Sequence, residues 1–131
     1  MSNEQGREVL PTTRDSLTHK FSINGHEAYL TVGLFDDGRP GEIFMKISKE
    51  GSTLSGLIQG FCRSFSIGLQ LGLSIEDAVS RFKGMRFDPA GATTNPDIPF
   101  ASSILDYLAR YLESQFGAES AWPAECVDQV A

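Results

Sequence analysis

The residues of this chain best suited to chemistry are two histidines and two cysteines. His19 and His26 flank an Asn-Gly pair, and the cysteines are Cys62 and Cys126. In a hairpin that turns at Asn-Gly, Ile23 opposes His26, so His19 lies two cross-strand pairs further along the same face. At about 3.3 Å per residue, the two imidazoles are then too far apart to chelate one ion. We therefore expect no metal site, and that each histidine lies at an end of the buried face.

The two cysteines do not have the surroundings of a catalytic thiol. A reactive thiol needs an electropositive, partly open environment. Cys62 lies between Phe61 and Arg63 in a predicted helix with no local partner, and Cys126 lies in the tail. We expect two free thiols in a reducing compartment. The chain also has no Ser-His-Asp set, P-loop or dinucleotide fingerprint, so we assign no catalytic residue.

The best candidate for binding chemistry is the segment from Lys49 to Thr53, KEGST. A glycine followed by hydroxyl residues at a helix start leaves backbone N–H groups free, and Lys49 adds positive charge. Lys49, Ser52 and Thr53 are therefore the candidate anion- or nucleotide-binding residues. Further cations that can converge on this site are Arg39, Arg81, Lys83 and Arg86. A helix capped by Ser52, next to a solvated lysine, explains the same residues, and both interpretations remain open.

The segment before this site has the pattern of an antiparallel hairpin. Asn24 and Gly25 supply the two positive φ angles of a type I′ turn between strands at Thr18–Ile23 and His26–Leu34. Its buried face is expected to carry His19, Phe21, Ile23, His26, Ala28, Leu30, Val32 and Leu34. The sequence DDGRPG predicts a second turn, followed by a third strand at Glu42–Ser48.

Helical periodicity predicts three helices after the strands, at Leu54–Leu71, at Ile75–Phe82 with Ser74 as its cap, and at about Phe100–Phe116. The first helix has an apolar stripe formed by Leu54, Leu57, Ile58, Phe61, Phe65 and Leu69. A second stripe consists of the small residues Gly56, Gly60, Ser64 and Gly68. Small residues let a neighbouring backbone come close, so we expect this helix to be buried on two sides. Replacing Gly60 with Leu is then expected to overpack the interior.

The order of these elements predicts one α+β domain at residues 17–116, a small antiparallel β-meander of about three strands followed by three helices packed on one face. Residues 1–16 are expected to form a flexible lead-in and residues 117–131 a flexible tail. A net charge of −6 argues against a mainly electrostatic nucleic-acid binder. No secretory segment or membrane span is visible, so we expect a cytoplasmic protein.

Two blocks of the sequence resemble a known family. They run from Thr18 to Phe61 and from Arg86 to Leu112, and with the helix between them they cover roughly residues 10–113. Matching positions include Gly25-His26-Glu27, Pro40-Gly41-Glu42, Lys49-Glu50-Gly51-Ser52-Thr53, Asn95-Pro96 and Ser103-Ile104. In this order they resemble the TSCPD-type accessory region that follows the catalytic barrel of adenosylcobalamin (vitamin B12)-dependent class II ribonucleotide reductases.

The resemblance implies a role without catalysis in this chain. In that family the radical-forming cysteine, the paired redox cysteines and the cobalamin-binding surface belong to the barrel, and none of those motifs occurs here. The chain begins with its own Met, and in place of the family's cysteine-rich zinc-ribbon-like tail it retains only Cys126. We expect no cofactor bound by this chain alone, with adenosylcobalamin in the related full-length enzyme. The isolated chain is not expected to reduce ribonucleotides.

Two functions are therefore open. The first is a non-catalytic accessory or regulatory module that acts in deoxyribonucleotide synthesis by associating with a ribonucleotide reductase catalytic subunit. The alternative is a free-standing regulatory domain that binds a nucleotide or another small anion and shares only the fold. Whether the chain is itself an enzyme, and whether it forms a homo-oligomer, are also open. We expect no membrane partner and no nucleic-acid partner.

Overall fold

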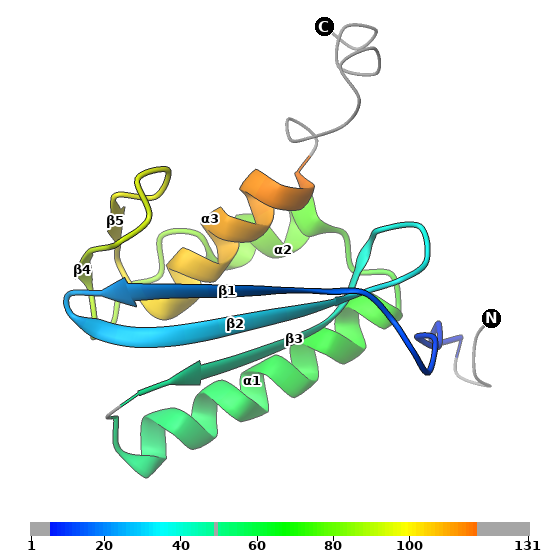
Figure 1. The fold of residues 1–131 in the computed structure, drawn as a ribbon, viewed down its shortest axis with the longest axis horizontal. Coiled ribbons are helices and arrows are strands. Elements are labelled where there is room, and N and C mark those ends of the chain that lie inside the picture. Colours follow the sequence, from blue (N-terminus) through cyan, green and yellow to red (C-terminus); the bar gives the residue numbers. More distant parts are fainter. Residues whose placement is uncertain (1–5, 49, 118–131) are drawn as a thin grey trace, which may run out of the picture.

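The computed structural model describes residues 6–48 and 50–117, as an antiparallel sheet with helices on one face (Figure 1). The elements are β1 (Ser16–Ile23), β2 (His26–Leu34), β3 (Pro40–Ile47), α1 (Ser52–Gln70), α2 (Ile75–Phe82), β4 (Gly91–Ala92), β5 (Phe100–Ala101) and α3 (Ile104–Phe116). The predicted α+β fold, with a three-stranded sheet followed by three helices, is confirmed. Apart from Gly117, the predicted tail lies outside the described residues, as do residues 1–5 of the predicted lead-in.

The hairpin has the predicted turn and register. Asn24 and Gly25 have φ angles of 50° and 82°, which a type I′ turn requires. Ile23 pairs with His26, and the pairing continues without a shift to Ser16 and Gly33. The strand order is β1-β2-β3. Both β1 and β3 begin two residues earlier than predicted, at Ser16 and Pro40.

The core lies between the inward face of the sheet and the helices. The strands contribute Phe21, Ile23, Ala28, Leu30, Val32, Ile43, Met45 and Ile47, all buried. In Figure 1, α1 lies along β3, and α2 packs on α3. The buried side of α1 is formed by Ile58, Cys62, Phe65 and Leu69, which are spaced three or four apart and so share one helical face. The aromatic ring of Phe21 on β1 stacks on Tyr107 of α3, with ring centroids 3.8 Å apart.

Side chains of α1 satisfy backbone groups on the β3 edge of the sheet, which makes them unavailable to another chain. The Ile43 N–H donates to the Ser66 hydroxyl at 2.8 Å, and the Gln70 side-chain amide donates to the Gly41 carbonyl at 2.8 Å. At the turn end of β1, the Asn24 N–H donates to the Ala92 carbonyl at 2.8 Å, so the loop around β4 contacts the hairpin there.

The stripe of small residues on α1 was interpreted wrongly. Gly56 and Gly60 are exposed, and a Cβ built at either position would meet no atom within 4 Å. Leu57, which was assigned to the buried stripe, is 67% exposed. The sheet covers only one side of α1, so the helix is not buried on two sides. Overpacking on replacing Gly60 with Leu is therefore no longer expected in the isolated domain.

The last helix begins four residues later than predicted. Phe100 and Ala101 extend the apolar pattern upstream, but they form β5 and pair with β4 instead. The helix starts at Ile104, where the Ser103 hydroxyl accepts the Asp106 N–H at 2.9 Å. The short helix α2 has its predicted bounds and the predicted cap at Ser74. The Ser74 cap thus located the start of α2, whereas apolar periodicity placed the start of α3 too early.

Candidate functional site

The most unusual surface of the domain is the side of α1 that faces away from the sheet, which we call the outer face of α1. At 100° per residue, seven exposed positions form one stripe along it: Thr53, Gly56, Leu57, Gly60, Ser64, Ile67 and Leu71. None of these seven is charged, and the one charged residue between Ser52 and Gln70, the exposed Arg63, lies at the margin of the stripe beside Gly56. The exposed fractions of Leu57, Ile67 and Leu71 are 67%, 42% and 53%.

This composition differs from that of an ordinary solvated helix face. A surface helix usually has charged and polar residues opposite its buried stripe. An exposed glycine in a helix interior costs about 1 kcal/mol relative to alanine, and Gly56 and Gly60 both fill such positions. The glycines in the middle of this face let the backbone of another helix approach closely. The large apolar side chains beside them would then be buried against that helix. The outer face of α1 therefore has the chemistry of a protein-docking surface.

The start of α1 is open to solvent, as an anion site would need. Ser52 and Thr53 are exposed, and they are the first two residues of the helix. Gly51 is the N-cap and no side chain caps the helix, so the expectation that Ser52 is the N-cap was wrong. Lys49 lies outside the described residues. The carboxylate of the neighbouring Glu50 lies 2.5 Å from the His26 imidazole, and its negative charge opposes a second anion. The anion site stays a prediction.

Three of the four additional cations have acidic partners of their own. Arg39 pairs with Asp37 at 2.7 Å and with Glu8 at 2.8 Å, and its hydrogen bonds to these two carboxylates raise the pKa of the guanidinium. The Glu8 N–H donates to the carbonyl of Gln70, so Arg39 is tied to the opposite end of α1 from Ser52.

Arg81 pairs with Asp77 at 3.6 Å and Lys83 with Glu113 at 2.8 Å. The contribution of Arg81, Lys83 and Arg86 to an anion site stays a prediction.

The histidines lie in separate environments, as the hairpin register predicts. The His26 imidazole faces Glu50, whereas the His19 imidazole contacts α3. Within residues 6–48 and 50–117, no group of three or more metal-ligating side chains comes together.

His19 belongs to a small polar and aromatic cluster that the sequence did not reveal. Its Nε2 lies 2.7 Å from the Tyr107 hydroxyl, which also accepts a hydrogen bond from the Asn95 amide at 3.1 Å. The imidazole stacks on the Tyr111 ring, with centroids 4.4 Å apart. Burial lowers the pKa of His19 and raises the pKa of both tyrosines. The cluster joins β1, α3 and the loop before β5, and its groups are already bonded to one another.

Asp106 is a second buried polar centre, and its partners give it a structural role. Its carboxylate accepts the Gly84 N–H at 2.6 Å and the Ser102 N–H at 2.9 Å, and it pairs with Arg110 at 3.0 Å. Burial alone would raise the pKa of Asp106, but these two N–H donors and the guanidinium hold it below its usual value. The carboxylate therefore ties the segment after α2, the turn after β5 and α3 together.

The described thiol does not have the properties of a nucleophile. Cys62 is 3% exposed within the core, and burial raises the pKa of its thiol to about 11, with a small opposing effect from a Met45 backbone hydrogen bond. At neutral pH it is therefore protonated and inert. Cys126 lies outside the described residues.

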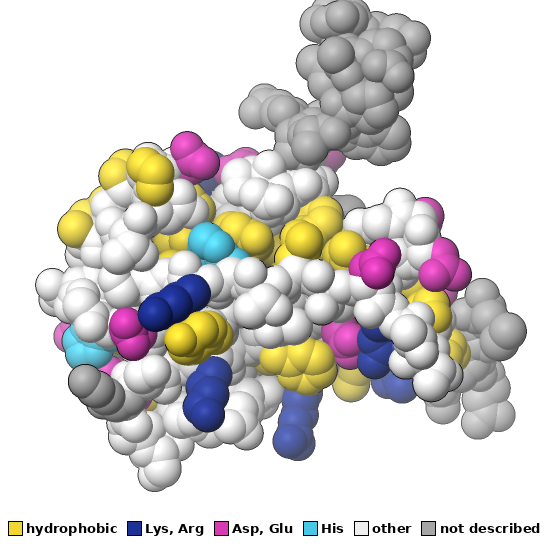
Figure 2. Space-filling view, viewed as in Figure 1, with side chains coloured by type: hydrophobic (Ala, Val, Ile, Leu, Met, Phe, Trp, Pro, Cys, Tyr) yellow, Lys and Arg dark blue, Asp and Glu magenta, His cyan; other side chains and the backbone are white. Residues whose placement is uncertain are grey.

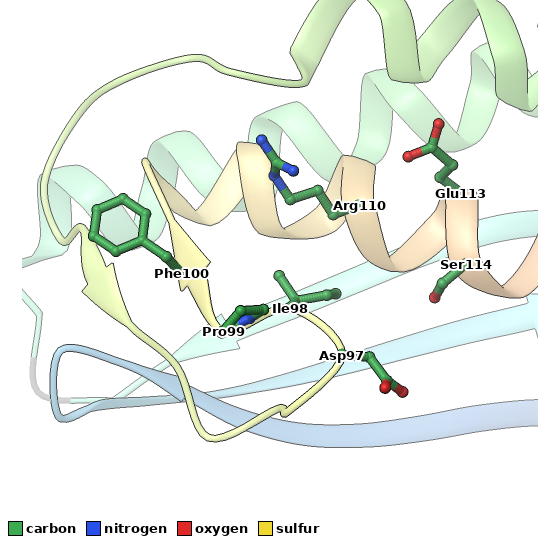
Figure 3. Close-up of a pocket in the computed structure, with 7 residues that line it drawn as sticks. All are labelled: Asp97, Ile98, Pro99, Phe100, Arg110, Glu113 and Ser114. Atoms are coloured by element: carbon green, nitrogen blue, oxygen red, sulfur yellow. The ribbon is translucent and has the colours of Figure 1, made fainter.

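One open hollow of about 550 Å³ lies beside α3 (Figure 3). It is lined by Asp97, Ile98, Pro99, Phe100, Arg110, Glu113 and Ser114. Two of its three charged groups are paired, Arg110 with Asp106 and Glu113 with Lys83. The third, Asp97, is a single exposed carboxylate, so the hollow offers no concentrated charge for a ligand.

The described residues form a helix-backed antiparallel sheet whose one described thiol is buried. Comparison with known families matches residues 4–116 to the TSCPD domain. The chain therefore belongs to the TSCPD domain family, and the resemblance found in the sequence is confirmed.

Relatives with this region are vitamin B12-dependent ribonucleotide reductases. The protein of that name from Rhodopirellula baltica is 54% identical over 110 residues, which are 84% of this chain and 11% of the relative. The one from Streptantibioticus cattleyicolor is 44% identical over 110 residues, again 84% of this chain and 18% of the relative. The chain thus spans less than a fifth of these relatives. No solved structure matches it.

Within residues 6–48 and 50–117, no helix is both long enough and apolar enough to cross a bilayer.

Proposed function

We propose that this domain is a non-catalytic accessory module that associates with the catalytic chain of a vitamin B12-dependent ribonucleotide reductase and so acts in deoxyribonucleotide synthesis. Its relatives contain this region within chains of which it is 11% to 18%. In such a chain, the domain has a large catalytic neighbour. A surface of this domain that fits such a neighbour therefore supports the proposal.

The observation that supports this proposal most is the outer face of α1. Leu57, Ile67 and Leu71 expose apolar area on a helix side without charge. Removing apolar area from water contributes about 25 cal/mol per Å². Gly56 and Gly60 leave space for a partner helix to approach the α1 backbone. In the proposed complex, the reductase chain covers this face, and it also binds adenosylcobalamin, for which this domain supplies no residue.

The proposal is tested by titrating the purified domain with a vitamin B12-dependent reductase catalytic chain from the same organism, using calorimetry. We expect saturable binding, weakened at least tenfold by Leu57→Glu, because a carboxylate would be buried without a partner. Met85→Glu is the matched control. Met85 is 40% exposed in the segment after α2 and is not part of the outer face of α1, so its replacement is expected to leave binding unchanged.

Other outcomes separate this proposal from its alternative. Absence of binding to the reductase, together with nucleotide-dependent shifts of the Ser52 and Thr53 amide resonances, would support a free-standing ligand-binding domain instead. Equal weakening by Leu57→Glu and Met85→Glu would contradict the assignment of the interface to α1.

A further inference from the structure

The sheet has a second exposed face, opposite the helices, which we call the outer face of the sheet. Two aromatic side chains project from it, Tyr29 on β2 and Phe44 on β3, with exposed fractions of 41% and 55%. Figure 2 shows hydrophobic and Lys or Arg side chains next to each other over these strands. Large exposed aromatic residues on neighbouring strands require an explanation, because the helices already cover the core side of the same sheet.

The strand register places these aromatics among cations. Tyr29 pairs with Lys20 on β1 and with Lys46 on β3, so these three residues form one row across the sheet. In the next row, Thr31 pairs with Phe44. Successive rows on one face are about 7 Å apart along the strands. Tyr29 and Phe44 are therefore diagonal neighbours, within reach of one extended ligand.

The charged side chains of this face are two lysines and two glutamates, so the face is balanced in charge whereas the whole chain carries −6. The Lys20 ammonium lies 5.8 Å from the Tyr29 ring centroid and 3.6 Å from the Glu27 carboxylate. Because Lys20 and Glu27 are both more than half exposed, their ion pair is weak and easily exchanged. Among the described residues, Lys46 has no ion pair. The further carboxylate on this face, Glu42, is held by Arg14 at 2.6 Å. Two lysines thus flank the aromatic pair, with one weakly engaged acid.

We propose that the outer face of the sheet binds a single strand of nucleic acid, with bases stacked on Tyr29 and Phe44 and phosphates contacted by Lys20 and Lys46. Proteins that bind single strands stack the bases on exposed aromatic side chains and contact the phosphates with cations. This stacking tolerates any sequence, because every base has a π face. A duplex keeps its bases stacked inside and would offer this face only phosphates. A net charge of −6 disfavours such general electrostatic binding, so stacking must supply most of the affinity.

The geometry also favours a strand over a free nucleotide. An open sheet face contacts one side of a ligand only, and a mononucleotide would engage one ring and one cation at most. A strand can stack on both rings and contact both lysines at once. Strand binding is a function beyond the proposed association with a reductase. It takes place on the face of β3 that points away from α1.

The test is fluorescence anisotropy with a labelled mixed-sequence DNA single strand of ten nucleotides. Tyr29→Ala and Phe44→Ala are each expected to weaken binding roughly 5- to 150-fold. Phe100→Ala is the matched control, since Phe100 is 59% exposed on β5, outside this face, and its loss should change nothing. Phe44→Leu keeps apolar volume without a ring, so it should weaken binding even if the alanine variant fails to fold.

The salt dependence supplies a second readout. With two phosphates contacted, the slope of log K against log salt should be about −1.4, and Lys46→Ala should reduce it to about −0.7. Leu57→Glu, which is expected to lose reductase binding, should keep strand binding, so the two proposals fail independently. No saturable binding at 1 mM protein, equal binding of the duplex or of a mononucleotide, or unchanged binding by Phe44→Leu would each overturn the inference.

Discussion

At the scale of single residues, the buried carboxylate of Asp106 illustrates how a charge can be kept inside a small domain. It is 0% exposed, yet it has two backbone N–H donors and a guanidinium as partners. A buried charge with this many donors is tolerated, whereas removing it leaves those donors without an acceptor. The residue therefore acts in folding rather than in binding.

Replacing Asp106 with Ala is expected to lower the free energy of unfolding by roughly 2–5 kcal/mol, because the Gly84 and Ser102 N–H groups lose their acceptor. The measurement is urea denaturation at pH 7. Asp97→Ala, at an exposed position in the loop before β5, should change the stability by less than about 0.5 kcal/mol. Similar losses of stability in Asp106→Ala and Asp97→Ala at pH 7 would contradict this role.

The stabilisation by Asp106 also depends on pH. Since the folded-state pKa of Asp106 is lowered, the stabilisation is present above its usual pKa of 3.8 and is lost as the pH falls through the folded-state value.

His19 is expected to make stability fall as the pH drops from 7 to 5. Burial lowers its folded-state pKa below the usual 6.5, so below that pH the unfolded chain takes up a proton that the folded chain excludes. The contribution is fully present above the unfolded-state pKa. His19→Gln removes this titration, and the urea midpoint of the variant should change less over this range. An imidazole that titrates above pH 6.5 in the folded protein, measured by NMR, would contradict the prediction.

At the scale of elements, α1 has a well-packed inner side, whereas the exposed glycines on its outer side lower the stability of the helix. Gly60→Ala is expected to raise the free energy of unfolding of the isolated domain by about 0.5–1 kcal/mol, because alanine is the better helix former and meets no atom there. Thermal denaturation measures this gain. The same change should weaken binding to the reductase, since the added methyl group holds the partner helix away from the α1 backbone. A loss of stability would show that Gly60 is packed in the free domain.

The elements also show how far the sequence predicts the structure. The Asn24-Gly25 turn and the Ser74 cap fixed the hairpin register and α2, because both depend on local backbone chemistry. The two strands β4 and β5 were missed, since two-residue strands have no periodicity. Leu57 was placed in the core because an apolar stripe does not reveal how much of a helix its neighbours cover.

The candidate sites were also predictable to different degrees, depending on whether the site is formed by neighbouring residues or by residues far apart in the sequence. A local motif indicated the exposed helix start at Ser52, but the Glu50 pair with His26 joins residues 24 apart and left no local signal. The row of Lys20, Tyr29 and Lys46 depends on pairing across three strands. Hairpin alternation placed Lys20 and Tyr29 on the outer face of the sheet, but the predicted strands gave no register for β3. Sites built within one element can be predicted from sequence, and sites built between elements require the fold.

At the scale of the whole molecule, the two candidate surfaces lie on different layers. The outer face of α1 is uncharged and apolar, whereas the outer face of the sheet carries aromatics and lysines. With the helices on one side of the sheet, both surfaces are accessible at once (Figure 1). A domain of this form can bind a reductase chain through α1 and leave the opposite layer free for a second ligand.

The central claim, that α1 docks on the reductase catalytic chain, is tested most directly by hydrogen exchange of the domain with and without that chain. We predict that adding the reductase slows exchange of α1 backbone amides, most strongly from Gly56 to Ile67, and leaves α2 unchanged. The Leu57→Glu variant should show no such protection at the same concentrations. Protection confined to α2 and α3, or equal protection in Leu57→Glu, would contradict the account.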